Sequence, residues 1–395
     1  MNEWKKVKIS DIGKVITGKT PKTSNSEYYG GNIPFLTPSD DMSVKYSRRT
    51  NKYITELGRL SVKNATLPPN AICVSCIGSD LGKVVITTQE TVTNQQINSI
   101  VVDTDKFDID FVYYSMLELG KILNFHSKTS TAVPIVNKSN FSQYEINCPG
   151  LDVQKKIGFV LSSIDKKIEK NEKINNNLEQ QAQAYFNELF VVNADPNWSE
   201  CTLSDIGSVV AGGTPSKSKP EYYADQGIAW ITPKDLSVNK SKFISHGEND
   251  ISELGFSKSS VAKLPAGTIL FSSRAPIGYI AIAQNEVTTN QGFKSVIPNE
   301  NISTAYMYFL LKNLLPTIEG MASGSTFKEI SGAAMKSVPT VMPDADTIQL
   351  FSSFCEPVFK EQEILEAENQ RLSALRDSLL PKLMSGELDV SNIEL

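Results

Sequence analysis

Ser10–Tyr29, SDIGKVITGKTPKTSNSEYY, recurs 194 residues later as Ser204–Tyr223, SDIGSVVAGGTPSKSKPEYY, with twelve identical residues in twenty. Unrelated segments of this length would share roughly one residue. The repeat continues in Ile33-Pro-Phe-Leu-Thr-Pro and Ile228-Ala-Trp-Ile-Thr-Pro, and in Thr93-Asn-Gln and Thr289-Asn-Gln. Solenoid units span only about 20 to 50 residues. Each half is therefore predicted to be a folded module with its own core, and the whole to be pseudo-twofold.

The composition is that of a water-soluble protein without disulfide bonds. Of the 395 residues 40% are hydrophobic, and no apolar run reaches the roughly eighteen residues that a membrane span needs. The first residues lack the apolar centre of a signal peptide. Five cysteines, an odd number, favour free thiols over a disulfide framework. We expect a cytoplasmic protein with no membrane contact.

The charge is distributed unevenly over four predicted segments. Residues 1–150 and 196–343, the two modules, carry 17 basic against 14 acidic and 12 against 12 residues. Residues 151–195 and 344–395, two helical regions, carry 6 against 7 and 4 against 11. The net charge of -5 therefore comes mainly from the last segment, and the modules are permitted by charge to bind nucleic acid.

Each module is predicted to be α+β, with an irregular and largely antiparallel sheet. Its β-branched segments are bounded by turn residues, as in 71–75, 83–88, 97–102, 268–272 and 279–283. A helix is expected to follow these strands in each module, over residues 107–123 and 303–315.

The helical regions show apolar residues at alternating spacings of four and three, which is typical of a coiled-coil seam. The seam includes Ile164, Ile168, Asn175 and Leu178 in the first region and Val358, Leu365, Asn369 and Leu372 in the second. Nearly forty residues would form a helix of roughly 55 to 60 Å, which needs a partner along its length. We expect the two helices to pair antiparallel. Asn175 and Asn369 occupy equivalent seam positions, where a buried polar residue can fix the register. A frayed or solvated middle of the helix, or a polar patch that faces a partner protein, would explain them as well.

Three repeated polar segments are candidates for contacts with phosphates and base edges. They comprise the loops with Lys19, Thr20, Lys22, Ser24, Thr214, Ser216, Lys217 and Lys219; the segments with Lys128, Ser130, Ser325 and Lys328; and the amides Asn94, Gln95, Gln96, Asn290 and Gln291. Taken singly, each segment is better explained as a structural element or a solvated connector than as a DNA contact. Taken together, they recur at matching places.

No catalytic or metal-binding motif stands out. Nucleotide-binding glycine loops, HExxH and GxSxG are absent, and the chain has only two histidines. Cys73 and Cys76 form a CxxC, but the second module has Leu270 and Ser273 there, so a buried strand is the better interpretation. We predict no catalytic residues and no metal site.

The motifs GxTP, EYY, I-x-[FW]-[LI]-TP and TNQ, followed by a long helix, resemble the specificity subunit of Type I restriction-modification systems. The resemblance implies two target recognition domains, each reading one half of a split, asymmetric site in double-stranded DNA. It also implies that the helices set the spacer and dock two modification (methyltransferase) subunits, with restriction (translocase and endonuclease) subunits completing the complex. S-adenosylmethionine, ATP and Mg2+ would bind to those partners and not to this chain.

The two modules differ within the candidate segments, so the two half-sites should differ in sequence. Arg274 is the best candidate for a base contact, to guanine, although a phosphate contact or a surface ion pair would also explain it. Half-sites read from one face of a duplex lie about 34 to 36 Å apart, a separation that rigid helices can hold.

Two other functions remain open at this point. The chain could be a coiled-coil scaffold whose modules bind proteins and not DNA. It could also be a carbohydrate-active enzyme that uses repeated carboxylates such as Asp40 and Asp235.

Overall fold

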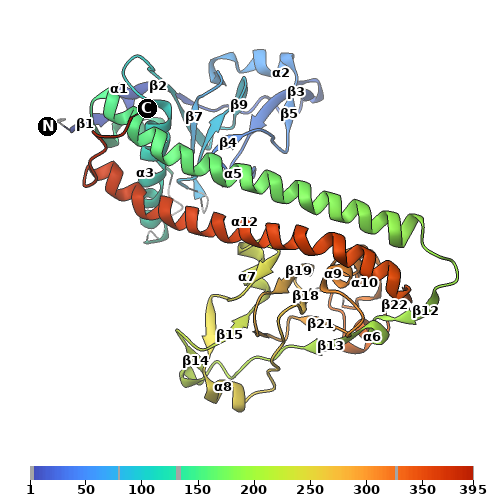
Figure 1. Ribbon diagram of the computed structural model, residues 1–395. Coiled ribbons are helices and arrows are strands. Elements are labelled where there is room, and N and C mark those ends of the chain that lie inside the picture. Colours follow the sequence, from blue (N-terminus) through green and yellow to red (C-terminus); the bar gives the residue numbers. More distant parts are fainter. Residues whose placement is uncertain (1–3, 79–80, 130–134, 325–327, 395) are drawn as a thin grey trace. The chain divides into compact units, whose positions relative to one another are not determined.

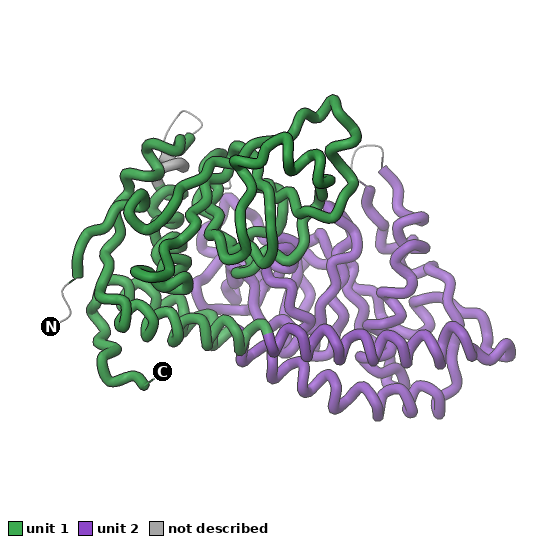
Figure 2. The backbone as a smooth tube through the Cα atoms, turned by 90° about the horizontal axis from the view of Figure 1, so that it is seen from above, with its two compact units in different colours: residues 1–169, 370–395 green, residues 170–369 purple. Residues whose placement is uncertain are grey.

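The computed structural model describes residues 4–78, 81–129, 135–324 and 328–394. The chain forms two compact units, residues 1–169 with 370–395 and residues 170–369 (Figures 1 and 2). Each unit combines one strand-rich module with part of each of two long helices.

Module 1, in the first unit, contains three sheets. The pair is β1 (Lys5–Lys8) and β11 (Glu145–Cys148). The five-stranded sheet has the order β2 (Gly13–Thr17), β10 (Ile97–Val102), β7 (Ile72–Ser75), β8 (Val84–Thr87) and β4 (Tyr46–Ser47). The four-stranded sheet has the order β5 (Tyr53–Ile54), β3 (Tyr29–Leu36), β9 (Thr91–Thr93) and β6 (Thr66–Leu67).

Module 2, in the second unit, repeats this arrangement. Its pair is β12 (Ser199–Thr202) and β22 (Pro339–Met342). Its five-stranded sheet has the order β13 (Gly207–Ala211), β21 (Lys294–Pro298), β18 (Ile269–Ser273), β19 (Ile277–Ala283) and β16 (Phe243–Ile244). Its four-stranded sheet has the order β14 (Tyr223–Ala224), β17 (Asn249–Ile251), β15 (Ile228–Ile231) and β20 (Thr288–Thr289).

The predicted α+β class is confirmed. Most strand pairs are antiparallel, but each module also has two parallel pairs: β4 with β8 and β3 with β9 in module 1, and β16 with β19 and β15 with β20 in module 2. One helix packs on each five-stranded sheet: α3 (Ile109–Thr129) and α9 (Thr304–Asn313). The shorter helices are α1 (Ile9–Ile12), α2 (Glu56–Ser61), α4 (Lys138–Gln143), α6 (Leu203–Ile206), α7 (Pro233–Val238), α8 (Glu253–Ser257), α10 (Leu315–Met321) and α11 (Gly332–Lys336).

The two long helices are α5 (Leu151–Asn187), which ends in a π-helical turn over Glu188–Val192, and α12 (Ala345–Ser385). Within each unit their segments run antiparallel. In the first unit Asp165 of α5 contacts Arg376 of α12. Lys156, earlier in α5, contacts Ser391, which follows the end of α12. In the second unit Tyr185 of α5 contacts Phe354 of α12 edge to face.

The predicted seam positions are buried or half-buried along both helices, while neighbours on the outer faces are exposed. The pairing of the seam asparagines differs from simple repeat equivalence. Asn369 accepts a hydrogen bond from Asn171 Nδ2 at 2.8 Å, and the carbonyl oxygen of Asn175 accepts one from Gln362 Nε2 at 3.2 Å. Asn175 and Asn369 therefore occupy equivalent positions of the repeat, but each bonds to a different residue of the opposite helix.

All five cysteines are free thiols, and four of them are buried. Burial raises the pKa of Cys73 to about 12, as expected for a strand residue and not for a reactive thiol. None of the helices in the described part of the chain combines the length and apolar character that a membrane crossing requires.

Candidate nucleic-acid interface

In module 1 the loop after β2 packs directly on the turn after β9. The amide of Lys19 donates to the Thr93 carbonyl at 2.8 Å, and the amide of Gly18 donates to the Ile97 carbonyl at 3.0 Å. The Thr20 hydroxyl donates to Gln95 Oε1 at 2.7 Å. Two of the three predicted segments therefore form one surface, which we call loop cluster 1 (residues 18–24 and 93–97).

Module 2 builds the same contacts from the equivalent residues. The amide of Gly213 donates to the Thr289 carbonyl at 2.9 Å, and the Thr214 hydroxyl donates to Gln291 Oε1. We call this surface loop cluster 2 (residues 212–219 and 289–293).

Glycine is required where each loop meets its turn. A Cβ atom on Gly18 would lie 2.0 Å from the Asn94 carbonyl oxygen, and one on Gly212 would lie 2.0 Å from that of Asn290. Because the obstacle is backbone in both cases, any side chain would force loop and turn apart.

The repeated tyrosines of the EYY motif hold the loops from below. The Tyr29 hydroxyl donates to the Pro21 carbonyl at 2.7 Å, and the Tyr223 hydroxyl donates to that of Pro215 at 2.8 Å. In module 2 the Trp230 indole also donates to the Gly213 carbonyl at 3.1 Å. The two tyrosines recur in both halves, which is the signal that could have identified them, whereas module 1 has Phe35 in place of Trp230.

The predicted side chains in the loops divide into exposed and engaged groups. Those exposed are Lys19, Lys22, Ser24, Gln95, Ser216, Lys217, Lys219 and Gln291. Thr20 and Thr214 are half-buried by their bonds to the glutamines. Asn94 Oδ1 accepts from the Gln96 amide at 3.1 Å, and Asn290 Oδ1 from the Gly292 amide at 2.8 Å, so each asparagine shapes its turn. Their contacts with DNA remain predictions.

Arg274 lies beside loop cluster 2, at the end of β18. The Ser273 amide donates to the Gly292 carbonyl of the turn at 2.7 Å, and Arg274 itself pairs with residue Glu329 in a β-bridge. Its guanidinium lies 3.5 Å from a Glu329 carboxylate oxygen, and Lys294 Nζ lies 3.7 Å from the other. Sequence reasoning missed Glu329, which carries no motif.

The third predicted segment, with Lys128, Ser130, Ser325 and Lys328, is described only in part. Lys328 is exposed and adjoins Glu329, and Lys128 belongs to helix α3. Ser130 and Ser325 lie outside the described residues.

The carboxylates considered for catalysis are engaged in turns. Asp40 accepts from the Thr37 amide at 2.7 Å and from the Asn51 amide, and Asp235 accepts from the Thr232 and Glu248 amides at 2.7 and 2.8 Å. Each thus stabilises a local fold. Among the described residues, histidines, cysteines and carboxylates form no group suited to a metal ion.

Comparison with known proteins identifies the family. The model of the Type I restriction modification DNA specificity domain matches residues 1–180 and 196–374. The chain therefore belongs to this family and carries two copies of its domain. This membership supports the DNA-recognition interpretation over the protein-interaction scaffold.

Individual relatives agree. The chain is 38% identical over 190 residues to the Type I restriction enzyme MjaIX specificity subunit of Methanocaldococcus jannaschii, covering 46% of this chain but only 44% of that protein. It is 22% identical over 473 residues to the HindI specificity subunit of Haemophilus influenzae, covering 98% and 100%. The solved S subunit from M. genitalium has the same fold, with a TM-score of 0.63 at 17% identity over 97% of this chain and 96% of that one.

Proposed function

We propose that each module reads one half of a bipartite, asymmetric DNA site, and that the chain has no catalytic activity of its own. The main support is that the two loop clusters share their backbone scaffold but differ in exposed side chains. Lys19 and Lys22 of module 1 correspond to Gly213 and Ser216 of module 2, and Arg274 corresponds to Ile77. A common frame with different donors suits the reading of two different sequences.

The long helices would hold the modules at a fixed separation and dock two modification subunits. Restriction subunits would complete the complex. S-adenosylmethionine, ATP and Mg2+ would then bind to those partners, which agrees with a chain whose sequence has none of the corresponding motifs. Since the modules are close to neutral, most of the affinity for phosphates would come from the assembled complex.

Co-expression of this chain with a Type I modification subunit from the same genome, followed by genome-wide mapping of methylated bases, tests the proposal. A split motif with two unlike half-sites and a fixed spacer is the expected result. A stable complex that methylates no defined motif would contradict it and favour a scaffold.

A further inference from the structure

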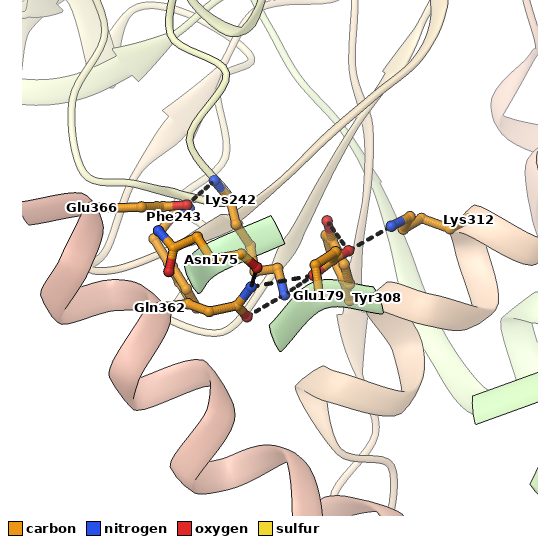
Figure 3. A network of polar contacts seen from close by, with 8 residues as sticks. All are labelled: Asn175, Glu179, Lys242, Phe243, Tyr308, Lys312, Gln362 and Glu366. Carbon is orange, nitrogen blue, oxygen red and sulfur yellow. Dashed lines mark hydrogen bonds and ion pairs between the residues drawn. The ribbon is translucent and has the colours of Figure 1, made fainter. Parts of the chain in front are cut away.

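Each module meets the helices through a small set of partly buried charges. Junction 1 comprises Lys45, Asp110, Asp165 and Arg376, and junction 2 comprises Lys242, Lys312, Glu179, Gln362 and Glu366 (Figure 3 shows junction 2). Lys45 and Lys242 occupy equivalent positions, each directly before the last strand of its five-stranded sheet (β4 and β16). The Lys45 carbonyl accepts from the Ile86 amide of β8, and the Lys242 carbonyl accepts from the Ile282 amide of β19. The lysine side chains are only 8% and 6% exposed.

In junction 1 Lys45 of the module and Arg376 of the helices each pair with an acid on their own side of the contact. Lys45 Nζ lies 2.7 Å from Asp110, which belongs to α3 of the same module. On the helices, Arg376 of α12 lies 2.9 Å from Asp165 of α5. The Tyr114 hydroxyl, donating to Asp165, links the two pairs. A further pair, Arg48 with Glu169, lies at the rim, where Arg48 is 55% exposed.

In junction 2 the module supplies both cations and the helices supply both anions. Lys242 and Lys312 each pair with Glu179 of α5, the latter at 2.5 Å. The Lys242 ammonium also donates to Gln362 of α12 at 2.7 Å. Glu366 of α12 accepts from the amides of Lys242 and Phe243 at 2.9 and 3.1 Å.

The charge states in junction 2 depend on the pairing of the lysines of module 2 with Glu179. Burial lowers the pKa of Lys242, and Glu179 offsets part of that effect. Burial raises the pKa of Glu179, but Lys242 and Lys312 together lower it more, so the carboxylate is charged. A buried ion without its partner is strongly destabilising.

The repeat offset of 194 shows what each junction would lack in the other position. Glu179 corresponds to Ser373, and Ala182 corresponds to Arg376. Module 2 on the first helix position would bring two lysines to a site that has an arginine and no counterpart of Glu179. Module 1 on the second position would bring its own Asp110 to Glu179 and Glu366.

We propose that the junctions form a position-specific lock: module 2 docks only where the helices present Glu179 without a competing cation, so that the two modules are not interchangeable along this chain. The partner recognised by each junction is thus one particular helix pair. The inference does not rest on DNA recognition, and its test involves no DNA.

The test is a chimera in which residues 196–343 replace residues 1–150, so that module 2 occupies both positions. We expect amide hydrogen exchange around Leu161 and Leu380 to speed up by roughly a hundredfold or more, since buried charges lose their partners. Exchange around Phe186 and Phe351 should stay as in the unaltered chain. Adding Ser373→Glu and Arg376→Ala to the chimera should restore most of the protection.

A matched control places the new acid on the outer face, as Ser378→Glu with Arg376→Ala, and should restore nothing, because Ser378 is exposed. Full protection in the chimera without helix substitutions would overturn the proposal. Equal rescue by Ser378→Glu would also overturn it.

A second measurement uses the unaltered chain and does not depend on the chimera. Lys312→Met and Glu179→Gln should be non-additive, the double variant losing no more protection than the worse single variant. Lys312→Met with Asp165→Asn should be additive, because these residues belong to different junctions. Additivity in the first pair would contradict the lock.

Discussion

Around the loop clusters the two modules make the same contacts with the same residue types, whereas at the two junctions they make different ones. Thr20 and Thr214 bond to Gln95 and Gln291 in the same way. By contrast, Lys45 pairs within its own module while Lys242 pairs with a helix. The repeat has therefore kept the frame that shapes the loops, while the charges that attach each module to the helices differ.

The largest expected effect separates the two junctions. Glu179→Ala removes the acid that Lys242 and Lys312 share and should destabilise the second unit by about 3–5 kcal/mol. Asp165→Ala should cost less, because Arg376 keeps Asp377 as a partner at 2.9 Å. Denaturant unfolding followed by hydrogen exchange measures both. Glu361→Ala, at an exposed position of α12, is the control and should change stability by less than about 0.5 kcal/mol. Equal losses for Glu179 and Asp165 would contradict the comparison.

The second prediction tests the shared frame. Gly18→Ala and Gly212→Ala should each cost about 1–3 kcal/mol, because the added methyl group would overlap a backbone carbonyl. Thermal unfolding of the two variants should give similar losses. Gly320→Ala, where no atom lies within 4 Å of the new methyl group, should be neutral or stabilising. A tolerated Gly212→Ala would show that loop and turn separate easily.

The third prediction sharpens the difference in exposed side chains. If Arg274 reads a guanine, Arg274→Gln should lower the discrimination against other bases at one position of one half-site by about 1–3 kcal/mol. The specificity for the other half-site should stay unchanged. Methylation of a library of substituted sites by the assembled complex measures this. Lys263→Gln removes a surface ion pair with Glu286 and should leave the motif intact. A uniform loss over all sites would instead indicate a phosphate contact.

The smallest effect is in the pH dependence of junction 2. The pKa of Glu179 is lowered from 4.5, so its contribution to stability is present above that pH and lost as the pH falls through its folded value. Burial raises the pKa of Glu366, so its contribution is present below pH 4.5 and lost as the pH rises through its folded value. Glu179→Gln should therefore flatten the acid loss, and Glu366→Gln should steepen it, in unfolding curves between pH 3 and 7. The same change in both variants would contradict these signs.

Much of the fold could be predicted from the sequence. The alternating spacing of four and three predicts α5 and α12, and residues 97–102 were predicted as the strand that β10 forms. The helix predicted over 303–315 is α9, which ends two residues earlier. These signals are periodic and local, so neighbouring residues reinforce them.

The junctions could not be predicted in this way. Lys45 and Lys242 stand in polar stretches without periodicity, and Glu179 lies on α5, in a segment without motifs. Their pairing is created by tertiary packing between distant segments. The contact between residues 18–24 and residues 93–97 in loop cluster 1 could not be predicted either. Recurrence marks both segments as important, but it does not show that they touch.

The first unit is built from two distant segments of the chain, residues 1–169 and 370–395, which has a consequence for folding during translation. Its core includes Leu380, Leu383, Met384 and Val390, which pack against Ile157 and residues of module 1. At about 5–20 residues per second, a ribosome needs roughly 10 to 45 s to pass from residue 169 to residue 395. The second unit, a continuous segment, can be completed before then. The unit whose synthesis begins first is therefore completed last, and the apolar face of the first turns of α5 stays uncovered until residues 370–395 have been made.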